Sequence, residues 1–104
     1  LDPPEWTTLR VVEDIHGAKQ ANGDNRVEWK PRPGAKGWWY VNKRADTKEV
    51  ISSGVLSVPH FIFTADEQVR EYGGQGSYMV MEIGEYSPSS DIRGPGTMFE
   101  GTVE

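Results

Sequence analysis

Residues 26–30 read Arg26-Val27-Glu28-Trp29-Lys30, an unbroken alternation of charged and apolar side chains. Successive side chains of a β-strand point to opposite faces, so the pattern predicts a strand with Val27 and Trp29 in the core and a charged outer face. Turn-forming residues flank it, Asn22-Gly23-Asp24-Asn25 before and Pro31-Arg32-Pro33-Gly34 after. The chain therefore contains at least one half-buried strand with a turn at each end.

Strand patterns recur along the chain with turn residues between them. The longest, Ser77–Tyr86, is apolar on both parities at its start, which favours a place in the centre of a sheet. Residues 87–96 are expected to form a loop, and a turn is expected at Gly17. The other predicted strands are 6–15, 37–43, 50–58 with Gly54 as a bulge, 60–63 and 98–103.

One short helix is expected over residues 65–72. Thr64 and Glu67 have the spacing of a capping box, in which each side chain bonds to the other residue's backbone N–H. Gly73 and Gly74 supply the left-handed conformation that ends many helices.

The composition favours an all-β fold. Val, Ile, Thr, Tyr, Phe and Trp make up 32 of the 104 residues, against 3 Leu and 5 Ala. Seven to eight short strands with turn signals between them and one helical turn predict an antiparallel β-sandwich or jelly roll, with a small barrel as the alternative. Because the chain has no Cys, disulfide-stapled folds, thiolate zinc sites and cysteine nucleophiles are excluded.

The length predicts one domain. Residues 1–5, with Pro3 and Pro4, are expected to be a hinge or linker, and residues 6–104 a single sandwich domain. Because residue 1 is not Met and the last residues look strand-like, we expect a fragment of a longer polypeptide. No apolar run approaches the roughly 20 residues of a membrane-spanning helix, so no membrane insertion is expected.

Charge is distributed unevenly along the chain. Residues 1–50 hold 9 Lys or Arg and 8 Asp or Glu, whereas residues 51–104 hold 2 and 8. Basic residues between Arg26 and Lys48 surround several aromatic residues, as in single-strand nucleic-acid binders. The formal net charge of −5 opposes that interpretation, because phosphate contacts are the main source of affinity in such proteins. We expect no nucleic acid among the partners of this domain, and cations on the solvent faces of strands.

The sequence offers no recognisable catalytic or metal motif. His16 and His60 stand in no metal-ligand spacing, and Gly73-Gly74-Gln75-Gly76 lacks the Lys-Ser/Thr of a phosphate-binding loop. The chain is therefore expected not to be an enzyme and to need no cofactor. Calcium is the one alternative that the sequence leaves open, because Asn22, Asp24, Asn25 and Asp91 offer oxygen ligands in loops. Such residues also favour turns for their own hydrogen-bonding reasons, so no metal site is predicted.

Adjacent Trp38 and Trp39 must point to opposite faces of a strand. One can therefore be core while the other is exposed, as a platform for sugar rings or an anchor for a protein interface. If a second layer covers the other face, both are structural, and the sequence leaves these interpretations open.

The chain resembles the protruding domain of small icosahedral RNA-virus coat proteins of the nodavirus and tombusvirus kind, with the crustacean nodaviruses as the nearer group. The resemblance rests on the Pro-rich entry Leu1-Asp2-Pro3-Pro4, the acidic cysteine-free composition, and the run Gly76–Tyr86, in which apolar and Glu residues mix after a Gly-rich turn. It implies a non-enzymatic domain on the virion surface that pairs as a homodimer, adjoins other coat-protein subunits and binds a host receptor or glycan.

Two groups of residues follow as site candidates on this interpretation. Loops would form a distal tip for recognition, with Asn22, Asp24, Asn25, Ser89 and Asp91 as candidates. The expected dimer contacts are the aromatic residues Trp38, Trp39, Tyr40, Phe61 and Phe63. The rival interpretation is a carbohydrate-binding module of a secreted enzyme, which would use exposed Trp and Tyr as sugar platforms.

Overall fold

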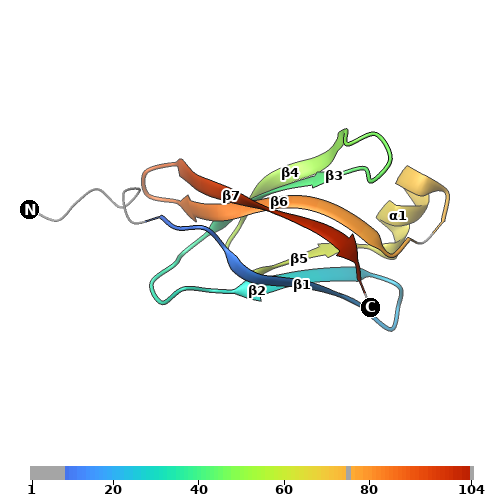
Figure 1. Cartoon of the computed structure of the whole chain (residues 1–104), viewed down its shortest axis with the longest axis horizontal. Coiled ribbons are helices and arrows are strands. Elements are labelled where there is room, and N and C mark those ends of the chain that lie inside the picture. The colour runs from blue at the N-terminus through green and yellow to red at the C-terminus, as the bar shows by residue number, and fades with distance from the viewer. Residues whose placement is uncertain (1–8, 75, 104) are drawn as a thin grey trace, which may run out of the picture.

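The computed structural model describes residues 9–74 and 76–103 and consists of two antiparallel sheets packed face to face (Figure 1). The smaller sheet contains β1 (Glu13–Lys19), β2 (Asn25–Lys30) and β5 (His60–Phe63), in the order β1-β2-β5. The larger sheet has the order β4-β3-β6-β7 and contains β3 (Trp38–Lys43), β4 (Val50–Leu56), β6 (Tyr78–Ser87) and β7 (Ile92–Thr102). This arrangement confirms the predicted all-β sandwich with one short helix.

The core lies between the two sheets and is built from alternate residues of the strands. Val27 and Trp29 of β2 are buried, as their alternation predicts, and they meet Met79, Met81 and Ile83 of β6. β6 lies between β3 and β7, inside the larger sheet, as its apolar start predicts.

The helix α1 (Ala65–Tyr72) begins and ends where the sequence predicts. Thr64 and Glu67 form the reciprocal capping box, and Gly73 takes the left-handed conformation at φ 76°. Figure 1 places α1 at one end of the sandwich, beside the turn between β1 and β2.

The first strand differs from the prediction. β1 begins at Glu13, and the expected hinge at residues 1–5 lies outside the described residues. Asp14 has φ 56°, and the β1–β2 register shifts between Glu13 and His16, so a bulge resets the alternation. Val12 is consequently buried and Val11 exposed.

Three glycine and loop predictions also need correction. Gly17 lies inside β1 rather than in a turn. A Cβ at this position would lie 2.2 Å from Val103 Cγ1, so Gly is required here for the close approach of β1 to Val103. Gly54 pairs regularly with Tyr40, and the bulge in this strand pair lies opposite Asn42 and Lys43. The expected loop over 87–96 is shorter, because β7 already begins at Ile92.

Candidate interaction surface

Four of the five aromatic residues predicted as dimer contacts face the interior. Trp38 and Phe63 are 4% and 2% exposed, and Trp38 packs edge-on against Trp29 with ring centroids 6.3 Å apart. The ring centroids of Tyr40 and Phe61 lie 4.5 Å apart between the sheets. The structure therefore assigns these side chains to the core rather than to an exposed stripe.

Trp39 points the other way, onto the outer face of the larger sheet, yet is only 8% exposed. Its indole lies over Gly84 and Gly96, where an added Cβ would come within 2.2 Å and 2.8 Å of the ring. The indole N–H donates to the Gly94 carbonyl at 3.0 Å, and the Arg93 guanidinium lies 5.8 Å from the ring centroid. Trp39 thus links β3 to β7 across β6 and is not an exposed platform for a ligand.

The outer face of the larger sheet, defined as the side chains that point away from the smaller sheet, carries exposed apolar residues. The strand registers place the residues of this face in three rows across the sheet: Val55, Trp39, Gly84, Gly96; then Ser53, Val41, Glu82, Met98; then Val50, Lys43, Val80, Glu100. Val50, Val55 and Met98 are 59%, 50% and 52% exposed. Exposed apolar side chains gathered on one face are typical of protein contact surfaces.

β4 is the edge strand of this face and carries no charge. The run from Val50 to Val58 contains no Asp, Glu, Lys or Arg, and Val58 is 42% exposed in the loop that follows β4. Within the described residues, β4 pairs with β3 alone. β4 is not among the sites predicted from the sequence, although the uncharged run is visible there.

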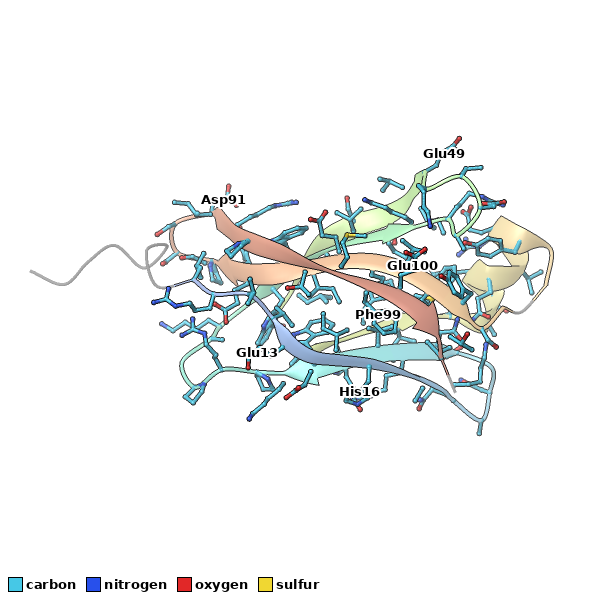
Figure 2. The ribbon with its side chains drawn as sticks, viewed as in Figure 1. Glu13, His16, Glu49, Asp91, Phe99 and Glu100 are labelled. Atoms are coloured by element: carbon cyan, nitrogen blue, oxygen red, sulfur yellow. The ribbon has the colours of Figure 1, made fainter. Side chains whose placement is uncertain are left out.

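The outer face of the smaller sheet is polar by contrast. Both ring nitrogens of His16 face acceptors: the Asp14 carbonyl lies 3.1 Å from Nδ1 and the Glu28 carboxylate 3.0 Å from Nε2, and each accepts a hydrogen bond when that nitrogen is protonated. These two contacts raise the pKa of His16, and those from His16 and Arg26 lower the pKa of Glu28. Figure 2 shows His16 on the side of this sheet that faces away from the larger one. This face is therefore solvated and ion-paired.

The predicted tip residues lie at opposite ends of the sandwich. Asp24 accepts a hydrogen bond from the Ala65 amide at 2.8 Å, and Asn22 and Asp24 bond to each other, so this turn packs on α1. Asp91 and Ser89 belong to the turn between β6 and β7, at the far end in Figures 1 and 2. The two predicted loops therefore do not form one tip.

Asn25, the last tip candidate, is buried in a polar cluster under α1. Its amide donates to the Gly76 carbonyl at 3.0 Å. Gln68, which is fully buried, donates to the Gly23 and Phe63 carbonyls and accepts from Lys19 Nζ and the Gly76 amide. Burial lowers the pKa of Lys19. The cluster fastens the helix to the sandwich and leaves Asn25 no exposed surface.

A second buried polar contact lies at the other end of the sandwich. Glu85 is 2% exposed and accepts two hydrogen bonds of 2.7 Å from Arg32 and one from the Arg10 amide. Burial opposes the charge of Glu85, but these hydrogen bonds outweigh it and its pKa is lowered. Glu85 and Arg32 line a cavity of about 180 Å³ together with Trp38.

The basic residues of 26–48 are dispersed over the molecule. Arg26 pairs with Glu28 on the smaller sheet, Arg32 with Glu85 at one end, and Lys48 with Glu100 on the larger sheet. Among the residues that the structure describes, no three His, Asp or Glu side chains gather to hold a metal ion. In that same part of the chain, no helix is long and apolar enough to cross a membrane.

No protein-family model matches the chain. A solved structure with a similar fold is the FN5 domain of Drosophila Lar, which is 12% identical in sequence with a TM-score of 0.49. The match covers 93% of this chain and 100% of that chain. A likeness of this size bears on neither function nor partner, and the resemblance to coat-protein protruding domains stays a prediction.

Proposed function

We propose that this chain is a non-enzymatic interaction domain whose partner is a second copy of itself, bound along β4. The observation that carries the proposal is the exposure of Val50, Val55 and Val58 on one uncharged segment. Edge strands of monomeric proteins are usually protected by charges, Pro or a covering segment, because their unpaired backbone groups pair readily with another strand.

The setting predicted from the sequence resemblance, a virion-surface protruding domain, is compatible with this proposal. A spike needs self-association for its assembly and an exposed surface for a host receptor or glycan. The exposed Met98 side of the outer face and the turn between β6 and β7 would remain available for such a receptor after pairing along β4.

Sedimentation equilibrium over a concentration series tests the proposal. The wild-type chain is expected to show a reversible monomer–dimer equilibrium. Val50→Glu and Val55→Glu should shift it to monomer, because each places a charge on the pairing edge, where charges oppose association with another strand. Met98→Glu is the matched control, since Met98 is equally exposed but lies on β7, and it should leave the equilibrium unchanged. A wild-type chain that stays monomeric at every concentration would refute the proposal.

Carbohydrate binding is the second candidate, and one feature favours it. A groove of about 330 Å³ is lined by Tyr72 and Tyr78, which are 36% and 47% exposed, and by small residues of the segment between α1 and β6. Exposed aromatic rings are the usual platforms for sugars. Polysaccharide titration of the wild-type chain and of Tyr78→Ala tests it, and binding that Tyr78→Ala leaves unchanged would exclude this groove.

A further inference from the structure

β4 is the sheet edge that the fold leaves least protected. On the opposite side of the sandwich, β1 and β7 close against each other: the Thr97 hydroxyl donates to the Val12 carbonyl at 3.3 Å, and Gly17 lies against Val103. β5, the other edge on the side of β4, has four residues. β4 has seven, includes neither a charge nor a Pro, and pairs regularly with β3 over Ser52–Leu56, with a bulge between Val50 and Ser52. A second strand can therefore pair most extensively with β4.

The direction of the backbone groups on β4 follows from its neighbours. The Tyr86 amide donates to the Gly37 carbonyl at 2.9 Å, immediately before Trp38 pairs with Glu85. Hydrogen-bonded pairs alternate along an antiparallel ladder, so the backbone groups of Trp39 point to β6 and those of the residues beside it point to β4. The β4 residues whose backbone groups point to the open edge are therefore Ser53 and Val55.

We infer that two copies pair β4 to β4, antiparallel, about a two-fold axis at Ser53, so that their four-stranded sheets join into one continuous sheet. This inference rests on the proposed self-association and specifies its geometry. Ser53 is the middle residue of β4 and has backbone groups at the open edge, as a two-fold axis through a hydrogen-bonded pair requires.

The side chains that this register brings together are compatible. On each side of the Ser53 pair, Ser52 lies opposite Gly54 of the other copy, so the residues around the axis are small and uncharged. The bulge between Val50 and Ser52 ends the regular pairing beyond them. No charged residue lies opposite another within the strand. Lys48, just before β4, is held by Glu100 at 2.7 Å and points across its own sheet.

Introducing a charge at residue 53 tests this geometry, because the two-fold axis places residue 53 opposite the same residue of the other copy. Ser53→Lys and Ser53→Glu should each weaken dimerisation by up to roughly fivefold, since like charges directly opposite on neighbouring strands repel. An equimolar mixture of the two variants should restore dimers in sedimentation equilibrium, because Lys then faces Glu. Ser53 is exposed, so both variants should fold, which circular dichroism and thermal melting verify.

Matched variants at Met98 serve as the control. Met98→Lys, Met98→Glu and their mixture should all dimerise as the wild-type chain does. If Ser53→Lys dimerises with the same affinity as the wild-type chain, pairing along β4 is wrong while self-association stands. If both Ser53 variants dimerise weakly and their mixture dimerises no better than either alone, the two-fold axis at Ser53 is wrong. A wild-type chain without any dimer would instead refute the proposed function itself.

Discussion

Substitution of Gly84 by Ala should strongly destabilise the domain, because the indole of Trp39 occupies the space of the new methyl group. A Cβ on Gly84 would lie 2.2 Å from Trp39 Nε1, 2.5 Å from Cε2 and 2.8 Å from the Pro95 carbonyl oxygen. All three are shorter than any ordinary contact, and the carbonyl belongs to the backbone of the adjacent strand. The indole must therefore lift by about 1 Å to reach ordinary van der Waals separation.

Two effects set the size of the loss. Overpacking of a well-packed site costs about 1–3 kcal/mol. Lifting the ring also breaks the 3.0 Å hydrogen bond to Gly94, a loss of about 1 kcal/mol. Replacing Gly in a strand returns about 0.5–1 kcal/mol through the entropy of the unfolded chain. The net loss in the free energy of unfolding is about 1–3.5 kcal/mol, which lowers Tm by roughly 5–25 °C in a domain of this size.

Urea unfolding followed by tryptophan fluorescence measures the effect. Gly101→Ala is the matched control, because it adds the same methyl group to the adjacent strand where nothing lies within 4 Å, and it should change stability by less than about 1 kcal/mol. In a Trp39→Leu background the cost of Gly84→Ala should fall by at least about 1 kcal/mol, since the ring is gone. An equal cost of Gly84→Ala in both backgrounds would refute the reasoning.

Three further predictions concern the polar contacts. Gln68→Leu should cost about 2–4 kcal/mol in urea unfolding by leaving buried carbonyls unpaired, whereas Val69→Ala on the exposed side of α1 should cost under about 1 kcal/mol; a small effect of Gln68→Leu would contradict the polar cluster. Because the pKa of Glu85 is lowered on folding, its charge stabilises the domain above the ordinary carboxyl pKa and this stability is lost as pH falls through the lowered value. Glu85→Gln should therefore flatten the acid limb of stability against pH, and an unchanged limb would contradict this. Because folding raises the pKa of His16, Glu28→Gln should lower it in an NMR titration and reduce the small stabilisation that is present below the ordinary His pKa and lost as pH rises through the raised value; an unmoved titration would contradict the contact.

Local features of the sequence predicted the secondary structure well. The helix over 65–72 and the strand over 60–63 have the predicted bounds, and the strand that begins with Arg26 is off by one residue. Alternation, capping and turn residues act within a few positions of the chain, so a single sequence contains them in full. The first strand was misplaced because the bulge at Asp14 breaks the alternation from which it was predicted.

The candidate surface was predicted less well, because alternation does not say which parity faces the core. Trp38 and Trp39 are equivalent in the sequence, and the packing of the second sheet buries Trp38. Trp39 is covered for a different reason, the absence of side chains at Gly84 and Gly96, which are 45 and more residues away in the chain. β4 lacked an aromatic residue and was therefore overlooked as a contact surface.

The sequence by itself determined the class of fold, the strands and the helix, because these depend on propensities and periodicities of neighbouring residues. Only the tertiary structure decided that the β1–β2 turn and the β6–β7 turn lie at opposite ends, that Glu85 meets Arg32, and that β4 is an open edge. Each of these depends on the order and register of strands far apart in the chain. That order is set by the joint burial of apolar faces and by backbone pairing, which no local pattern specifies.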